Sequence, residues 1–186
     1  MICIVGPTAS GKTQLASALA AELDGEIISC DSRQVFRGMD IGTGKDLKDY
    51  HYKDKHIPYH LIDILPAGAK YSVFDYQKDF WEVYPQILSR GKKAILCGGT
   101  GLYTEAVTKG YSMPEVAINN LLRKKLSDKN LNELADILRQ YRPLHNNTDI
   151  DTCKRAIRAI EIELYRKSHA AEWVEYPPIP SLYIGV

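Results

Sequence analysis

The sequence predicts an α/β fold in which helices flank a parallel sheet, with a small helical insertion added. Short apolar runs that end in glycine or polar residues alternate with segments of helical periodicity, which is the pattern of successive βαβ units. The first apolar run leads directly into a glycine-rich loop, and an amphipathic helix follows that loop. A chain of 186 residues is long enough to bury one core and carry one small appended part.

The composition narrows the class of protein. The formal net charge is only +1, so no global basic field indicates a nucleic-acid partner. No apolar run is long enough to cross a bilayer, and the first residues resemble a strand rather than a signal peptide. The four cysteines are widely spaced and form no C-x-x-C pair, which argues against a disulfide framework or a zinc site. We expect a cytoplasmic protein without a membrane partner.

In the first half of the chain, the pattern of apolar and polar residues predicts three strands, one helix and one long loop. Residues 1–5 predict the first strand, and residues 12–23 predict a helix with one apolar face. A second strand is expected at 26–30 and a short strand at 60–64. The stretch 37–58 is polar and rich in lysine, tyrosine and histidine, so we expect a long functional loop rather than a packed element. Its part at 45–60 is either an RNA contact or an ordinary loop.

The second half continues the alternation. Ser72 is a plausible N-cap for a helix over 73–90, and a buried strand is expected at 93–97. Residues 98–101, with the sequence Gly-Gly-Thr-Gly, end that strand and open another helix.

Helical periodicity alone fills residues 112–145, which are therefore predicted to form the insertion. The core then consists of residues 1–111 and 146–186. Its last part is expected to contain a basic helix at 149–167 and a final strand at 181–186.

A phosphate-binding loop (P-loop) follows the first strand. The spacing G-x-x-x-x-G-K-T is met by Gly6, Gly11, Lys12 and Thr13. Glycines let the backbone wrap around an anion, and the N-terminus of the next helix adds positive potential. Lys12 supplies a charge for the terminal phosphate, and the Thr13 hydroxyl is suited to bind Mg²⁺. These residues predict a P-loop NTPase-like core and binding of a nucleotide such as ATP, or of another diphosphate. The predicted phosphate-binding residues are Gly6, Pro7, Thr8, Ala9, Ser10, Gly11, Lys12 and Thr13.

Phosphate binding alone does not give the reaction. Asp31 ends the second strand, but the sequence after it is not typical of the magnesium-binding strand of a motor-type NTPase. By itself, Asp31 is either a catalytic carboxylate or one that orders the following loop or helps to hold Mg²⁺. Thr100 is, by itself, most simply a helix N-cap.

Further segments carry a more specific signal. They are Asp31-Ser32-Arg33-Gln34-Val35-Phe36, Met39-Asp40-Ile41-Gly42-Thr43-Gly44-Lys45, Pro58-Tyr59-His60-Leu61-Ile62-Asp63-Ile64, Gly98-Gly99-Thr100-Gly101-Leu102-Tyr103, and the basic stretch 151–162. In this order they resemble the tRNA dimethylallyltransferase (tRNA isopentenyltransferase) family, over residues 1 to about 165. Members of that family transfer an isopentenyl group from dimethylallyl diphosphate to the exocyclic amine of the adenosine beside the anticodon. Phe36 stands where the family often has tyrosine, and the relatives continue beyond the last strand.

The resemblance implies a role for each candidate. Lys12 and a Mg²⁺ ion held through Thr13 would stabilise the departing pyrophosphate. Asp31 would take the proton of the amine, and Thr100 would donate a hydrogen bond to the bridging oxygen of the donor. Arg158, with Arg155 as a second candidate, would clamp the diphosphate. The implied partners are the tRNA anticodon stem-loop and dimethylallyl diphosphate, with Mg²⁺ as cofactor. The implied tRNA-binding residues are Asp31, Ser32, Arg33, Gln34, Thr100, Arg123, Lys154, Arg155, Ala156, Ile157 and Arg158.

The sequence is also compatible with three other functions. An adenylate isopentenyltransferase resembles this family but uses free AMP, ADP or ATP as acceptor. A P-loop small-molecule kinase would use Asp31 to activate a hydroxyl, and a non-catalytic nucleotide- or RNA-binding module is a weaker alternative. The insertion at 112–145 and the cluster 154–158 favour a large RNA acceptor. A chain that stops at a strand suggests a truncated form that keeps the donor site, and a monomer is expected.

Overall fold

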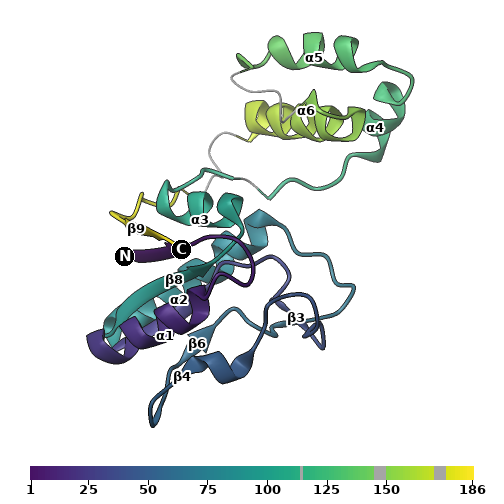
Figure 1. The fold of residues 1–186 in the computed structure, drawn as a ribbon. Helices are drawn as coiled ribbons and strands as arrows, with labels where there is room; N and C mark the ends of the chain where they lie inside the picture. The colour runs from purple at the N-terminus through teal and green to yellow at the C-terminus, as the bar shows by residue number, and fades with distance from the viewer. Residues whose placement is uncertain (114, 145–149, 170–174) are drawn as a thin grey trace. The chain divides into compact units, whose positions relative to one another are not determined.

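The computed structural model describes residues 1–113, 115–144, 150–169 and 175–186. They fall into two compact units (Figure 1). The first consists of residues 1–111 and 175–186 and contains the sheet; the second consists of residues 112–174 and is helical.

The first unit is built on a five-stranded parallel sheet with the strand order β6-β2-β8-β1-β9. Every neighbouring pair in this order is parallel, which confirms the predicted fold class. Parallel strands are covered on both faces, and for this reason their sequences are almost continuously apolar. The strands are β1 (Ile2–Val5), β2 (Gly25–Ser29), β6 (Tyr59–His60), β8 (Lys93–Gly98) and β9 (Leu182–Gly185).

Successive residues of the central strands enter two different hydrophobic clusters. Ile28 and Leu96 face α2 (Val73–Ser89) and α3 (Gly101–Thr108), whereas Ile27 and Ile95 face α1 (Lys12–Leu23). The alternation follows from the pleat of a strand, which points neighbouring side chains to opposite faces. Helices therefore cover both faces of the sheet (Figure 1).

The polar stretch 37–58 is more structured than the sequence predicts. It contains a 3₁₀ helix, η1 (Leu47–Tyr50), and a two-stranded hairpin of β4 (His51–Tyr52) and β5 (Lys55–His56). The expectation of a loop without packing is wrong, because Tyr50 and Ile57 are 2% and 3% exposed and belong to the cluster beneath α1. Isolated apolar residues of this kind leave no periodic signal in the sequence.

The strand expected at 60–64 is shorter than predicted. Only β6 (Tyr59–His60) joins the main sheet. Leu61 and Asp63 both have positive φ values, 60° and 55°, so the chain turns there. It then enters β7 (Leu65–Pro66), which pairs with β3 (Phe36–Arg37) in a separate two-stranded sheet.

The second unit contains α4 (Asn120–Leu126), α5 (Leu131–Arg139) and α6 (Cys153–Ser168). Its core joins Leu134 and Leu138 of α5 to Ala156 and Ile160 of α6. The basic helix α6 therefore belongs with the insertion, which differs from its expected place in the core. The expected boundary between residues 145 and 146 lies outside the described residues. None of the helices in the described part is both long and apolar enough for a bilayer crossing.

Candidate active site

A cavity of about 390 Å³ lies at the carboxyl edge of the sheet, where the P-loop follows β1. In parallel α/β sheets this edge is the usual place for a ligand. One wall is formed by residues 8–13 of the P-loop, and another by the turn and helix start from Asp40 to Tyr50. Asp31, Gln34 and the end of β8 complete the lining. The cavity thus collects three of the motifs that the sequence singles out.

The P-loop has the geometry of an anion cradle. Gly11, at the N-cap of α1, has φ 83°, a left-handed conformation that favours glycine. A Cβ atom on Gly6 would clash with the carbonyl oxygen of Val186, so a side chain would push the loop away from β9. The Lys12 ammonium lies over its own loop, donating to the Pro7 carbonyl and, at 3.4 Å, to Ser10 Oγ. Lys12 and Thr13 both line the cavity.

Asp31 follows β2 and is half-buried on the cavity lining. Its Oδ1 accepts a hydrogen bond from the Arg33 amide at 2.8 Å, which closes a tight turn. Its Oδ2 makes no hydrogen bond to any residue that the structure describes. One carboxylate oxygen therefore orders the turn, and the other is available to a ligand.

Thr100 meets the Asp31 segment from the neighbouring strand β8. Its Oγ1 accepts a hydrogen bond from the Ser32 amide at 3.0 Å, and its own amide donates to the Cys30 carbonyl at 3.1 Å. It occupies the N-cap position of α3, yet its side chain makes no capping hydrogen bond. The expected N-cap position is therefore confirmed, but the Thr100 hydroxyl is bonded to the Ser32 amide and does not cap the helix.

The close approach of these two segments depends on Gly98. A Cβ atom at this position would lie 2.6 Å from the carbonyl carbon of Cys30 and 2.7 Å from its oxygen. With a side chain at Gly98, the ends of β2 and β8 would have to move apart, and the hydrogen bond between the Ser32 amide and Thr100 would be disrupted.

Gln34 is 8% exposed, and its side-chain amide is engaged within the chain. Its Oε1 accepts from Ser29 Oγ at 3.0 Å, and its Nε2 donates to the carbonyls of Thr43 and Gly44, both at 3.3 Å. It therefore joins β2 to the turn that forms the second wall. Arg33, in contrast, is exposed and Ser32 is half-buried.

In the second unit, two predicted arginines converge on one carboxylate. Glu161, 3% exposed, accepts from Arg123 at 2.7 and 2.8 Å, from Arg158 at 3.0 Å and from the Asn119 amide at 3.0 Å. Arg158 also donates to the Val116 carbonyl at 2.8 Å. Burial raises the pKa of Glu161, but the hydrogen bonds from Arg123, Arg158 and the Asn119 amide outweigh it and lower that pKa to about 2. Glu161 stays ionised and fixes both guanidinium groups.

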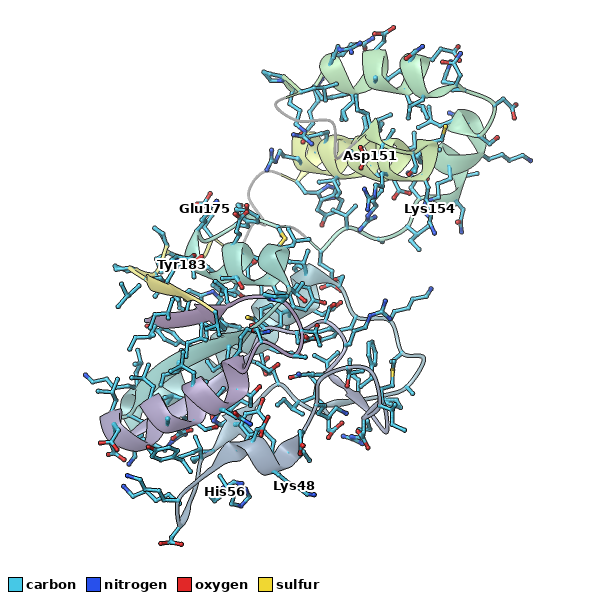
Figure 2. All side chains as sticks on the ribbon, in the orientation of Figure 1. Lys48, His56, Asp151, Lys154, Glu175 and Tyr183 are labelled. Atoms are coloured by element: carbon cyan, nitrogen blue, oxygen red, sulfur yellow. The ribbon has the colours of Figure 1, made fainter. Side chains whose placement is uncertain are left out.

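The remaining predicted residues of α6 differ in exposure. Lys154 and Arg155 are exposed, and Arg155 pairs with Asp151 at 2.7 Å. Figure 2 labels Lys154 on this helix and Asp151, which precedes it. Ala156 is fully buried in the core of the unit, and Ile157 packs against that core. The expectation that the Ala156 side chain contacts tRNA is wrong, because the helix turns it away from solvent.

The cavity offers oxygen donors of the kind that Mg²⁺ prefers. Thr13, which carries a hydroxyl, and Asp31, which carries a carboxylate, both line it. The Cys97 thiol also lines it, but burial raises its pKa to about 12, so it stays neutral. The described residues contain no group of three or more acidic, histidine or cysteine side chains that could hold a metal ion, so a magnesium ion fits only where a bound phosphate supplies further oxygen ligands beside Thr13.

Comparison with known proteins gives consistent matches. Residues 34–186 match the model of a family described as IPP transferase, and residues 1–57 match the one described as Isopentenyl transferase. Over its whole length the chain is 61% identical to tRNA dimethylallyltransferase 1 of Parabacteroides distasonis and 60% identical to tRNA dimethylallyltransferase 1 of Porphyromonas gingivalis. It spans 61% and 62% of the length of these curated relatives.

Among solved structures, the chain is similar to the full-length tRNA isopentenylpyrophosphate transferase from Bacillus halodurans. The TM-score is 0.62 and the sequence identity is 34%. The match covers 99% of this chain and 58% of that chain.

Proposed function

Because the chain belongs to the IPP transferase family, we propose that it carries the donor and catalytic site of a tRNA dimethylallyltransferase. The reaction joins the dimethylallyl group of dimethylallyl diphosphate to the exocyclic amine of the adenosine adjacent to the anticodon in tRNA. The observation that supports this proposal best is the grouping of the candidate residues around the carboxyl edge of the sheet. Lys12, Thr13 and Asp31 line one cavity, and Thr100, which lies outside that lining, is hydrogen-bonded to the residue after Asp31.

The departing group is pyrophosphate, and the P-loop suits it. As the allylic C–O bond breaks, negative charge grows on the bridging oxygen. The loop amides, the N-terminus of α1 and the Lys12 ammonium stabilise that charge. Thr100 accepts from the Ser32 amide, and its own hydrogen is committed only to a 3.4 Å contact with Ser32 Oγ. It is therefore available to donate to the bridging oxygen.

The acceptor is an aromatic amine, which is a weak nucleophile until its proton is removed. As the N–C bond forms, that proton passes to the second oxygen of Asp31, which is not used in the turn with Arg33. The adenine has to leave its stack to reach this carboxylate, because an enzyme cannot reach the amine inside a stacked loop. Half-buried Ser32 and exposed Arg33 follow Asp31 directly and are proposed contacts of that nucleotide.

Two further contributions complete the proposal. A magnesium ion held through Thr13, when bound, would offset the charge of the two phosphates. Arg158 uses part of its guanidinium group on Glu161 and Val116, which leaves further N–H groups to bind phosphate. Lys154 and Arg155 are proposed to bind the tRNA backbone. The names of the curated relatives support a tRNA acceptor over free AMP.

A two-donor, two-acceptor assay tests this function. The protein is given labelled dimethylallyl diphosphate or labelled ATP, each with unmodified tRNA or with free AMP. We expect label only in tRNA and only from the prenyl donor. Label confined to AMP would indicate an adenylate isopentenyltransferase, and phosphate transfer from ATP would indicate a kinase; either result would overturn the proposal.

A further inference from the structure

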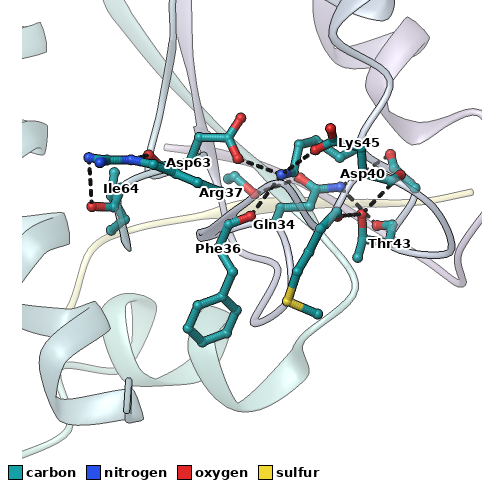
Figure 3. Close-up of polar contacts among 11 residues, drawn as sticks. Gln34, Phe36, Arg37, Asp40, Thr43, Lys45, Asp63 and Ile64 are labelled. Carbon is teal, nitrogen blue, oxygen red and sulfur yellow. Dashed lines mark hydrogen bonds and ion pairs between the residues drawn. The ribbon is translucent and has the colours of Figure 1, made fainter. Parts of the chain in front are cut away.

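Lys45 is a buried lysine in the motif Met39–Lys45, a segment with no role in the chemistry above. Its side chain is fully buried. Its ammonium donates to the Phe36 carbonyl at 2.8 Å, to Asp40 Oδ1 at 2.9 Å and to Asp63 Oδ1 at 2.5 Å. Figure 3 shows these bonds meeting at the Lys45 nitrogen.

The ammonium is fully satisfied in this position. It has three N–H donors, and three acceptors surround it. Burial lowers the pKa of Lys45, but the hydrogen bonds to Asp63 and Asp40 outweigh it, and the pKa is raised above its ordinary value. Lys45 is therefore charged, and it compensates two carboxylates that would otherwise add negative charge beside the cavity.

The contacts of Lys45 hold one specific turn. The residues from Met39 to Asp46 leave β3 and return towards the P-loop, and Thr43 Oγ1 closes the turn by donating to the Met39 carbonyl at 2.7 Å. Gln34 adds its two bonds to the carbonyls of Thr43 and Gly44. Buried polar groups thus fix both the start and the end of this turn.

The same turn forms the second wall of the phosphate cavity. Asp40 and the run from Gly42 to Asp46 line it, opposite residues 8–13. At Gly44, which has φ 66°, an added Cβ atom would lie 3.2 Å from Thr8 Cγ2 of the P-loop. The turn therefore reaches the P-loop itself.

We infer that Lys45 is a positioning residue of this site: it holds the Met39–Asp46 turn against the P-loop and balances Asp40 and Asp63 where an anion is to bind. The inference rests on the proposed function only for the identity of the ligand, since it requires only that the cavity receive a phosphate group. A merely structural ion pair would change stability and leave ligand binding by the folded protein unaltered.

The test compares Lys45→Met with Lys48→Met. Methionine keeps an unbranched apolar stem and removes the ammonium group, and Lys48 is an exposed lysine of η1 in the same segment (Figure 2). The first measurement is the Kd for inorganic pyrophosphate with Mg²⁺, by calorimetry at a temperature where circular dichroism shows both variants folded. We expect Lys45→Met to raise this Kd by about tenfold, the effect of losing one nearby unit charge. Lys48→Met should leave it unchanged.

Hydrogen exchange supplies a readout that needs no ligand. In Lys45→Met the amides of residues 39–46 should exchange faster, while those of α2 keep their protection. In prenyl transfer, the KM for dimethylallyl diphosphate should rise and kcat should change little. If Lys45→Met does not fold, Asp63→Asn takes its place in the exchange measurement, because it weakens one contact of Lys45 and leaves the pair of Lys45 with Asp40. Faster exchange of residues 39–46 is expected there, and unchanged exchange would contradict the inference.

The outcomes separate this inference from the proposed function. A Kd for pyrophosphate that depends on Lys45 in a protein that transfers no prenyl group would support the inference and refute the function. A prenyltransferase in which Lys45→Met leaves both KM and the exchange of residues 39–46 unchanged would overturn the inference alone. A wild-type protein that binds no pyrophosphate would overturn both.

Discussion

The two oxygens of the Asp31 carboxylate differ in their hydrogen bonds to the described part of the chain. Oδ1 closes the turn with the Arg33 amide, and Oδ2 is left for a ligand. The two interpretations that the sequence left open, a loop-ordering carboxylate and a catalytic one, are therefore compatible. Sequence reasoning treats a residue as one unit and cannot divide its atoms between roles.

Asp31→Asn separates these roles, because the asparagine side-chain oxygen can still accept from the Arg33 amide. We expect prenyl transfer to fall by about 10²–10⁴-fold, the usual contribution of a general base. Donor affinity should stay near that of the wild type, as measured by calorimetry with dimethylallyl diphosphate. Asp31→Ala should lose transfer as well. An equal loss of donor binding in Asp31→Asn would point instead to a metal or structural role.

Glu161 makes a prediction about pH. Its pKa is about 2 in the folded protein, against 4.5 as its ordinary value, so the folded state binds its proton more weakly than the unfolded state. The stabilisation is present above pH 4.5 and is lost as the pH falls towards 2. At neutral pH it amounts to about 3 kcal/mol, since one pKa unit corresponds to about 1.4 kcal/mol.

Urea unfolding of the wild type and of Glu161→Gln, followed by helical circular dichroism, measures this effect. The amide side chain of the variant is neutral at every pH, so the difference in unfolding free energy between the two proteins should be largest at pH 7. It should shrink between pH 4.5 and pH 2. A difference that stays constant over this range would show that Glu161 has no lowered pKa.

At the scale of elements, the ends of β2 and β8 decide the geometry of the site. Gly98 allows the two strand ends to approach, and Thr100 and Ser32 then form the hydrogen bond that joins them. The P-loop reaches the same edge from β1, which pairs with β8 on its other side. Three adjacent strands thus present Lys12, Asp31 and Thr100 at one edge of the sheet.

A pair of glycine substitutions tests this arrangement. Gly98→Ala puts a methyl group into the backbone of Cys30, and we expect a loss of about 1–3 kcal/mol in unfolding free energy together with weaker donor binding. Gly101→Ala is the matched control, since its methyl group meets nothing within 4 Å at the start of α3. It should be neutral or slightly stabilising. Equal thermal shifts in the two variants would refute the close approach of β2 and β8.

Much of the element order could be predicted from the sequence, and the misses have physical causes. The helix over 12–23 begins and ends where its periodicity predicts, and Ser72 caps α2 as expected. The packing of Tyr50 and Ile57 could not be predicted, because single apolar residues in a polar stretch show neither helical nor strand period. The burial of Lys45 could not be predicted either, because it depends on a contact with Asp63, 18 residues further along the chain.

At the scale of the whole molecule, the helix α6 shows what an amphipathic pattern leaves undecided. The pattern shows that one face is apolar, but not which element covers it. The structure pairs that face with α5, so the basic helix belongs to residues 112–174 rather than to the sheet. The candidate residues are therefore divided: the P-loop, Asp31 and Thr100 lie in one unit, and Arg123, Lys154 and Arg158 in the other.

The proposed tRNA contacts of the helical unit predict a salt dependence. Affinity for tRNA should fall steeply as salt is added, because each neutralised phosphate releases counterions. Lys154→Gln should reduce the slope of log K against log salt by about one. Lys129→Gln is the control, since Lys129 lies 3.8 Å from Glu133 in a surface pair. An identical slope for wild type and Lys154→Gln would exclude Lys154 from the RNA contact.

The most direct test of the central claim is which phosphate ligand the P-loop holds. Calorimetry with Mg²⁺ should compare dimethylallyl diphosphate, inorganic pyrophosphate and ATP on the wild type and on Lys12→Ala. We predict that dimethylallyl diphosphate binds more tightly than ATP and that pyrophosphate displaces dimethylallyl diphosphate. Lys12→Ala should bind neither dimethylallyl diphosphate nor pyrophosphate. Tighter binding of ATP, with its conversion to ADP, would contradict the claim that the loop holds a leaving group.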